Sequence, residues 1–322
     1  MILEILALLG GLVLLYLGAE LLVKGAVELG QRAGVSPIVV GLTVVSIGTS
    51  APELVVCILA ALRGSPELAA GNVLGSNLAN VGLILGLAAL VRPLEVHRRV
   101  IRREIPWMLG ITVVALGALW NLEVGRLEGT VLALTLLVYL AFLVPQARKE
   151  GMEVLGETGE RLERQVPSLR DTGLGVLVRP LACVLGGSVG LVLGGQGVVH
   201  GATAVAVDLG VPELVVGLSI LAVGTSLPEL AATLVAAARS EADLAVGNIV
   251  GSNIYNILGI GGATALVAPG EVPAEIVGFD NFVMLGVTLL LVIFAWTGLR
   301  IGRREGAVLL AGYAAYIYFI LP

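Results

Sequence analysis

The chain has 322 residues, of which 57% are hydrophobic and only 13% are charged. A soluble domain carries about 25% charged residues, so a folded globule of this length would lack the polar side chains to cover its surface. The apolar content excludes a disordered chain, and a net charge of −5 without a dense basic tract argues against a nucleic-acid partner. The composition therefore predicts an all-α polytopic membrane protein surrounded by the lipid bilayer.

Ten mostly apolar runs are long enough to cross a bilayer as helices, which takes about 20 residues. The expected spans cover residues 2–23, 37–62, 66–91, 105–120, 127–145, 178–207, 212–238, 242–268, 280–298 and 305–321. The first run has no basic segment before it, so we expect it to remain as a span and not to be cleaved as a signal peptide. The polar segment 146–177 is predicted to be a cytoplasmic linker between a first half, 1–145, and a second half, 178–322.

The basic residues predict the orientation of these spans, because cytoplasmic loops are enriched in Lys and Arg. With the N-terminus outside, only Arg63 and Arg126 of the 19 basic residues lie on the outer side. The other 17 lie in cytoplasmic connections: Lys24, Arg32, Arg92, Arg98, Arg99, Arg102, Arg103, Arg148, Lys149, Arg161, Arg164, Arg170, Arg179, Arg239, Arg300, Arg303 and Arg304. This asymmetry predicts ten spans with both termini outside.

One segment of the chain is repeated. Residues 41–86 align without a gap to residues 217–262, at an offset of 176 residues and with 21 identities in 46 positions. The chain is therefore predicted to be a duplication of a five-span unit. Because five is odd, corresponding spans cross the membrane in opposite directions, which gives two inverted five-helix repeats. Many secondary transporters have this arrangement, with the binding site at the midplane between the repeats.

The second and seventh spans each contain a proline followed by an acid. Residues 48–53 read GTSAPE, and residues 224–229 read GTSLPE. Proline lacks an N–H and clashes with the carbonyl four residues before it, so helices 2 and 7 are expected to break there. In a membrane, the freed carbonyls are tolerated only where they are buried in protein or line a cavity. The breaks therefore mark the predicted site.

Hydroxyl and amide side chains accompany the two acids, because residues three and four apart share one helix face. The hydroxyls beside the acids are Thr49 and Ser50 with Glu53, and Thr225 and Ser226 with Glu229. In the third and eighth spans, GNVLGSNLAN and GNIVGSNIYN give the pairs Ser76 with Asn80 and Ser252 with Asn256. The remaining motif asparagines are expected either to bond between helices or to act as ligands: Asn72, Asn77, Asn248 and Asn253.

An ionised glutamate near the bilayer centre costs about 2.5 kcal/mol or more, and no basic residue of the spans is placed to neutralise Glu53 or Glu229. One interpretation is that both carboxyls are protonated and hydrogen-bonded to neighbouring hydroxyls. The other is a cation site of two carboxylates with hydroxyl, amide and carbonyl oxygens. Such hard ligands suit Ca²⁺, Na⁺ or Mg²⁺ and not soft metals.

The paired motifs resemble the two alpha repeats of the calcium/cation antiporter superfamily, most closely its prokaryotic sodium/calcium exchanger branch. The resemblance implies that Glu53 and Glu229 bind both Ca²⁺ and Na⁺. It further implies backbone carbonyls from Thr49, Thr225, Ser46 and Ala222, and side chains from Ser50, Ser226, Ser76, Ser252 and Asn80. Asn256 completes the predicted set. Some relatives have Asp at that position, and the acid to which the resemblance ties potassium co-transport is therefore absent.

The resemblance implies a secondary active antiporter, not an enzyme, in a prokaryotic cell (inner) membrane. It would exchange Na⁺ for Ca²⁺ by alternating access and extrude calcium, with the first and sixth spans as gates. It implies the transported ions but no cofactor and no obligate protein partner. A proton/calcium antiporter on the same scaffold is the main alternative, and a passive cation channel is a further one. A hydrolase would need a base beside Ser50 or Ser226, and no histidine is near in sequence.

Overall fold

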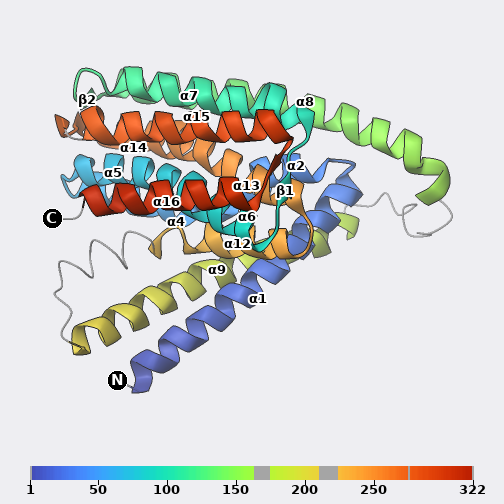
Figure 1. Ribbon diagram of the computed structural model, residues 1–322, viewed down its shortest axis with the longest axis horizontal. Coiled ribbons are helices and arrows are strands. Elements are labelled where there is room, and N and C mark those ends of the chain that lie inside the picture. Colours follow the sequence, from blue (N-terminus) through green and yellow to red (C-terminus); the bar gives the residue numbers. More distant parts are fainter. Residues whose placement is uncertain (1, 163–174, 210–223, 275, 321–322) are drawn as a thin grey trace.

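The computed structural model describes residues 2–162, 175–209, 224–274 and 276–320, and most of these residues are helical. Figure 1 shows a long tilted pair of helices, α1 (Ile2–Ala33) and α9 (Gly175–Asp208), beside a bundle that contains the other helices. A helix satisfies its backbone hydrogen bonds within its own segment, which is what lipid surroundings require.

The bundle elements follow in chain order, with η marking π-helical turns. The first half contributes α2 (Pro37–Val40), η1 (Gly41–Val45), α3 (Ser46–Thr49), α4 (Ala51–Leu62), α5 (Pro66–Leu78), η2 (Ala79–Leu85), α6 (Gly86–Val91), β1 (Leu94–Glu95), η3 (Val100–Glu104), α7 (Ile105–Ala118), β2 (Glu123–Val124) and α8 (Arg126–Leu162). The second half contributes α12 (Leu227–Ala238), α13 (Ala242–Tyr255), η6 (Asn256–Gly261), α14 (Gly262–Val267), β3 (Gly270–Glu271), η7 (Ile276–Asp280), α15 (Asn281–Gly298), β4 (Arg300–Ile301) and α16 (Arg303–Ile320).

Corresponding elements of the two halves recur at the offset of the sequence repeat. The helix α4 begins at residue 51 and α12 at residue 227, and α5 begins at residue 66 and α13 at residue 242, so both intervals are 176 residues. The short strands pair crosswise, β1 with β4 and β2 with β3, and both pairs are antiparallel. Each two-stranded sheet thus takes one strand from each half.

The helices α1 and α9 pack through glycine-rich faces that let their backbones approach closely. A Cβ on Gly11 would lie 2.8 Å from the carbonyl oxygen of Gly194, and a Cβ on Gly25 would lie 2.9 Å from that of Pro180. Contacts farther along α1 therefore fall earlier along α9. The two helices occupy corresponding places in the repeat and run antiparallel.

The number of spans is less than ten when judged by length and apolar composition alone. Six helices of the described residues are long and apolar enough to cross a membrane, and the bent pair Pro37–Thr49 and Ala51–Leu62 makes a seventh if it is one span. The helix α12 is apolar but shorter, and the start of the predicted span 212–238 lies outside the described residues. The chain is a polytopic helical membrane protein, and its ten spans stay a prediction.

Three helices are longer than the apolar runs that predicted them. The helix α1 continues from residue 23 to Ala33, the turn η3 precedes the predicted span 105–120 without a gap, and α8 continues to Leu162, inside the segment predicted as a linker. A charged residue ends an apolar run in the sequence, but it does not end a helix. Lys, Arg and Glu are good helix formers, so a helix can continue after it leaves the hydrocarbon region. Hydropathy therefore marks the lipid-facing part of each helix and not its full length.

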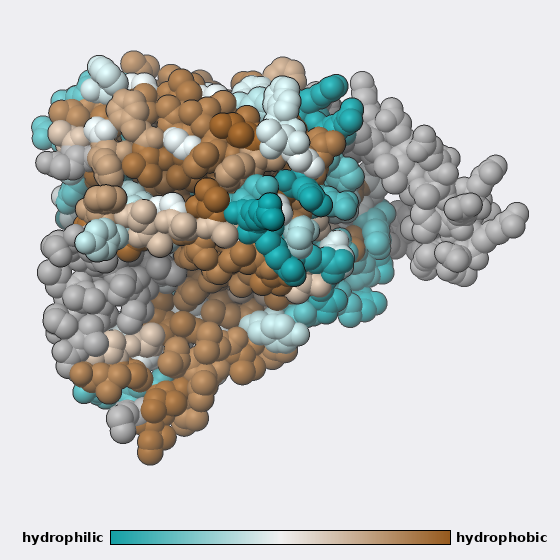
Figure 2. All heavy atoms as spheres, viewed as in Figure 1, coloured by the Kyte–Doolittle hydropathy of each residue, from teal (hydrophilic) through white to brown (hydrophobic). Residues whose placement is uncertain are grey.

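The outer surface is apolar over wide areas. Figure 2 shows hydrophobic residues over much of the face of the bundle that is in view and over α1, with the largest group of hydrophilic residues near β1. Large apolar side chains such as Leu6, Val13 and Leu17 are more than half exposed along α1. A continuous exposed apolar surface of this kind is typical of contact with a membrane.

Replacing Gly18 by alanine is expected to destabilise the protein, because the new Cβ would lie 2.8 Å from the backbone nitrogen of Leu191 in α9. Overpacking of this kind costs about 1–3 kcal/mol and should lower the melting temperature in detergent. Gly10→Ala on the same helix is the control, since a Cβ there meets nothing within 4 Å. Equal melting temperatures for the two variants would contradict the close packing of α1 on α9.

Candidate cation site

A break in the helix precedes each of the two glutamates. The helix α3 ends before Ser50, whose backbone angles (φ −86°, ψ 4°) leave the helical region, and α4 continues at an angle of 45°. Ser226 (φ −90°, ψ 6°) precedes α12 in the same way. Proline is favourable in the first turn of the new helix, where a backbone N–H would have no partner. The predicted break in helix 2 is confirmed. For helix 7 the described residues show the turn at 225–226 and the start of α12, and the part of that span before residue 224 lies outside them.

The breaks place Glu53 and Glu229 in the first turns of α4 and α12. The N-terminal end of a helix carries a positive partial charge that stabilises a carboxylate. Each glutamate is only 1% exposed. The two helix ends thus offset part of the cost of burying these groups, without supplying a counter-ion.

The glutamates come together from opposite halves of the chain. Ser50 Oγ donates a hydrogen bond of 2.8 Å to Glu229 Oε1 and lies 3.3 Å from Ser252 Oγ. Glu229 also interacts with Glu53 and with Thr49. Residues predicted from three separate motifs therefore meet in one buried cluster.

A π-helical turn lies at each of the two site asparagines. Asn80 lies in η2, and Asn256 is the first residue of η6. A π-helical turn changes the direction of the side chains around it, and such turns are frequent at functional sites. No sequence pattern predicted these turns. A π-helical turn has slightly more residues per turn than an α-helix, and segments this short do not reveal the difference in the spacing of their apolar residues.

Asn80 and Asn256 are held by asparagines of the opposite half. Asn80 Nδ2 donates to Asn253 Oδ1 at 3.0 Å, and Asn256 Nδ2 donates to Asn77 Oδ1 at 3.2 Å. All four side chains are buried. Of the two roles expected for Asn77 and Asn253, the structure therefore shows bonding between helices.

Another pair of asparagines contacts the site threonines. Thr49 Oγ1 lies 3.3 Å from Asn248 Oδ1, and Thr225 Oγ1 lies 3.5 Å from Asn72 Oδ1. Asn248 Nδ2 donates a hydrogen bond to the Thr233 hydroxyl, and Asn72 Nδ2 donates one to the Cys57 sulfur. Both threonine hydroxyls thus donate their hydrogens inside the protein, and each threonine also has a carbonyl oxygen, the group that the resemblance implies as its ligand. Sequence reasoning passed over Thr233, although its offset from the core residue Cys57 is that of the repeat.

Five buried oxygens of the predicted ligands have no hydrogen-bond partner within the described part of the chain: Glu53 Oε2, Glu229 Oε2, Ser226 Oγ, Asn80 Oδ1 and Asn256 Oδ1. Each unpaired buried polar atom costs about 1–3 kcal/mol, and a charged one costs more. Oxygens of this kind are the ligands of a hard cation, which takes about six to eight of them when it is Ca²⁺. No cluster of three or more His, Cys, Asp or Glu side chains occurs among the described residues, so amide and hydroxyl oxygens must complete such a site.

The other predicted ligands are placed as follows. Ser46 is fully buried, and its carbonyl oxygen accepts the Ser50 N–H at 2.9 Å. Ser76 is buried in α5, and Thr225 is half-buried in the turn before α12. Ala222 lies outside the described residues.

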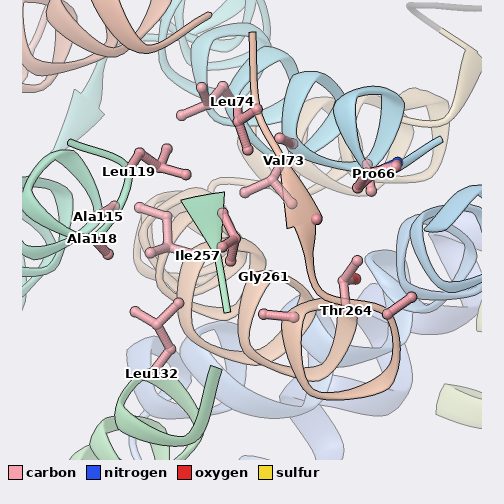
Figure 3. Close-up of a pocket in the computed structure, with 17 residues that line it drawn as sticks. Pro66, Val73, Leu74, Ala115, Ala118, Leu119, Leu132, Ile257, Gly261 and Thr264 are labelled. Atoms are coloured by element: carbon pink, nitrogen blue, oxygen red, sulfur yellow. The ribbon is translucent and has the colours of Figure 1, made fainter. Parts of the chain in front are cut away.

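An apolar cavity of about 70 Å³ lies between α5, α7, α8 and α14, and none of the predicted ligands lines it. Figure 3 shows its aliphatic wall, including Val73, Leu119 and Leu132, with the hydroxyl of Thr264 at one side. A hard cation needs several oxygens, which this wall does not supply. The cavity is therefore separate from the carboxylate cluster.

A polytopic helical chain whose two halves bring carboxylates and amide oxygens together in its interior has the architecture of an ion transporter. The family model described as "Sodium/calcium exchanger protein" matches residues 3–144 and 179–321. The chain belongs to the sodium/calcium exchanger family, as its motifs predicted.

Individual relatives align over nearly the whole chain. Inner membrane protein YrbG of Escherichia coli (strain K12) is 40% identical, over 100% of this chain and 99% of its own length. Sodium/calcium exchanger MaX1 of Methanosarcina acetivorans is 35% identical over 97% of each chain. A solved structure of the sodium-calcium exchanger NCX_Mj, soaked with Na⁺ and Ca²⁺, matches with a TM-score of 0.85 and 29% identity over 100% of both chains. The relatives are transporters, and the chain is thus a membrane transport protein, not an enzyme.

Calcium is expected to raise the melting temperature of the purified protein, because a ligand that binds only the folded state stabilises it by about 2.7 kcal/mol at one hundred times its Kd. Glu53→Gln and Glu229→Gln each remove one carboxylate and should abolish most of this shift. Glu271→Gln, at an exposed acid in β3, is the control and should leave it unchanged. A full shift in both site variants would refute the proposed ligand set.

Proposed function

We propose that this protein is a secondary active antiporter that exchanges Na⁺ for Ca²⁺ across the membrane. The proposal rests on the five unpartnered oxygens, which include one from each of Glu53 and Glu229. Two carboxylates carry the charge that one Ca²⁺ neutralises, and the surrounding oxygens are hard ligands that suit either ion. Membership of the sodium/calcium exchanger family supports cation transport.

Competition for the shared ligands couples the two ions. Because Ca²⁺ and Na⁺ both require Glu53 and Glu229, binding of one excludes the other. A conformational change without a bound ion would carry two unneutralised carboxylates through low-dielectric surroundings, which is costly. The carrier therefore changes conformation when it is loaded, and each return trip requires an ion.

Ten spans in two inverted five-helix repeats, with helices 2 and 7 broken, form the scaffold of this proposal. Three observations support it. The elements recur at one offset, the corresponding helices α1 and α9 are antiparallel, and the strands pair crosswise between the halves. Inverted repeats supply the two related conformations in which a central site opens to opposite sides.

The helices α1 and α9 are proposed as the gate. They contact each other through glycines along much of their length, so they can shift as a pair against the bundle. The helix α9 also packs on both breaks, since a Cβ on Gly48 would meet Ser188 and a Cβ on Gly224 would meet Val199. A shift of α9 would therefore act directly on the turns that carry the carboxylates.

A proton/calcium antiporter on the same scaffold is the second candidate, and the buried glutamates themselves favour it. A proton binds a carboxyl oxygen and needs no further ligands. The unpartnered amide oxygens of Asn80 and Asn256 and the hydroxyl of Ser226 would coordinate Ca²⁺ in such an exchanger as well, but they would have no ligand in its proton-loaded state. These oxygens favour sodium as the counter-ion.

The distribution of basic residues supports an orientation with both termini outside and segment 146–177 in the cytoplasm. The direction of exchange follows the ion gradients, and the inward sodium gradient of the cell would drive calcium outward. The localisation proposed is the prokaryotic inner membrane.

Vesicles loaded with Na⁺ and diluted into sodium-free buffer are expected to take up ⁴⁵Ca²⁺ when they contain this protein. Uptake that is driven by a pH gradient and does not depend on sodium would refute the sodium exchanger and support the proton antiporter. Uptake that needs no counter-ion at all would indicate a channel.

Glu53→Gln and Glu229→Gln should each reduce this uptake to the level of protein-free vesicles, because one remaining carboxylate leaves Ca²⁺ half-neutralised. Glu271→Gln serves as the control. Normal exchange in either site variant would disprove the shared-carboxylate mechanism.

An epitope tag after Pro322 is expected to be accessible to antibody in intact spheroplasts, whereas a tag inserted at residue 165, in the predicted linker, should be accessible only after the membrane is permeabilised. The reverse pattern would overturn the proposed orientation.

A further inference from the structure

Two methionines lie directly behind the asparagines of the site. Met108 in α7 and Met284 in α15 are 0% and 2% exposed. Asn253 Nδ2 lies 3.7 Å from Met108 Sδ, and Asn77 Nδ2 lies 3.8 Å from Met284 Sδ, both within range of a hydrogen bond to sulfur. The same contact thus occurs twice at positions related by the repeat, and each time it joins an asparagine of one half to a methionine of the other.

A thioether sulfur can accept a hydrogen bond but has no proton to donate. The sulfur therefore favours the amide orientation in which Nδ2 faces the methionine. For Asn77 the backbone oxygen of Asn253, 3.5 Å from the same Nδ2, favours this orientation together with the Met284 sulfur. The carbonyl oxygen of the same amide then faces the other way. For Asn77 this oxygen accepts from Asn256 Nδ2 at 3.2 Å, and for Asn253 it accepts from Asn80 Nδ2 at 3.0 Å.

The same logic applies to the next amide. The Nδ2 atoms of Asn80 and Asn256 donate hydrogen bonds to Asn253 and Asn77. The Oδ1 atoms of Asn80 and Asn256 are therefore turned away from these partners. Both Oδ1 atoms are buried, and neither has a hydrogen-bond partner in the described chain. A reversed amide would present two N–H groups to the ion in place of an oxygen, and N–H groups repel a cation.

We propose that Met108 and Met284 are positioning residues that fix the polarity of two amide relays, Met284–Asn77–Asn256 and Met108–Asn253–Asn80, so that each relay ends in a carbonyl oxygen facing the cation. The inference rests on the proposed function in taking the carboxylate cluster as the cation site. It adds a role for two apolar residues that touch no ion.

Packing alone is the competing explanation, because methionine is a common filler of irregular cores. Packing requires volume at these positions but no sulfur. It does not account for an amide nitrogen directed at each of the two sulfurs in corresponding places of the repeat. The two explanations differ in what happens when sulfur is removed and volume is kept.

The test uses the full-length purified protein with Met108→Leu, Met284→Leu and the double substitution. Binding of ⁴⁵Ca²⁺ is measured by equilibrium dialysis, and the calcium KM and maximal rate are measured in sodium-loaded vesicles. Ile111→Leu in α7 and Leu291→Ile in α15 are the controls, since both residues are buried to 2% or less and change shape without changing polarity.

Each methionine variant is expected to weaken calcium binding and raise the KM about tenfold, the usual effect of losing a group that orients a metal ligand. The double variant should show a larger loss than either single one. The maximal rate should change much less than the KM, and the controls should bind calcium as the unaltered protein does.

Norleucine and selenomethionine, each incorporated at all methionines, give a second measurement that does not depend on folding of the leucine variants. Norleucine keeps the length of the side chain without an acceptor and should weaken binding, whereas selenomethionine keeps an acceptor and should not. Equal calcium affinity for the two labelled proteins would overturn the relays.

A double variant that binds calcium within about twofold of the unaltered protein would also overturn the relays. An equal loss of calcium binding in the control variants would do the same. Neither result would contradict the proposed function. An unaltered protein that binds calcium without sodium-driven uptake would refute sodium exchange, while the binding comparison would still decide on the relays. Absence of calcium binding by the unaltered protein would refute both.

Discussion

Two carboxylates must be buried together in an apolar membrane protein, and much of the structure serves that constraint. Each of Glu53 and Glu229 lies in the first turn of a helix that begins after a non-helical serine. Regular backbone hydrogen bonding is therefore interrupted where each acid enters the interior. Helix N-termini and the Ser50 hydroxyl stabilise part of the charge. The two carboxylates and the unpartnered oxygens of the predicted ligands are the proposed cation site. The same imbalance makes ion binding favourable and movement of the ion-free protein costly.

The buried asparagines hold oxygen atoms in fixed positions in the interior without adding charge to it. A third or fourth buried acid would supply further oxygens but would raise the cost of burial beyond what one cation offsets. In the proposed site a carboxamide supplies one oxygen to the cation, while its nitrogen bonds the opposite half, as the nitrogens of Asn80 and Asn256 do. The bonds between halves thus hold the scaffold and direct the ligands at once. The halves are not identical, since Ser50 bonds Glu229 whereas Ser226 Oγ has no partner among the described residues.

Features with a local cause were predictable. Proline has no N–H and clashes with the preceding turn wherever it occurs, so the breaks before Glu53 and Glu229 follow from the order of residues alone. Helix ends were predicted less well, because an apolar run records contact with lipid while helical hydrogen bonding continues past it, as in α1 and α8. The π-helical turns at Asn80 and Asn256 have no local signal, since they depend on what packs against the helix.

The sequence by itself determined that the chain enters the membrane, that it is duplicated, and that two glutamates with hydroxyl and amide neighbours form its chemical centre. These properties depend on composition, on an internal offset and on spacing along single helices. Only the tertiary structure decided which asparagines turn an oxygen to the site and which support them from behind. The orientation of an amide depends on the groups that face its nitrogen. For Asn253 this group is the Met108 sulfur, and for Asn77 it is the Met284 sulfur together with the backbone oxygen of Asn253, all from helices far away in the chain.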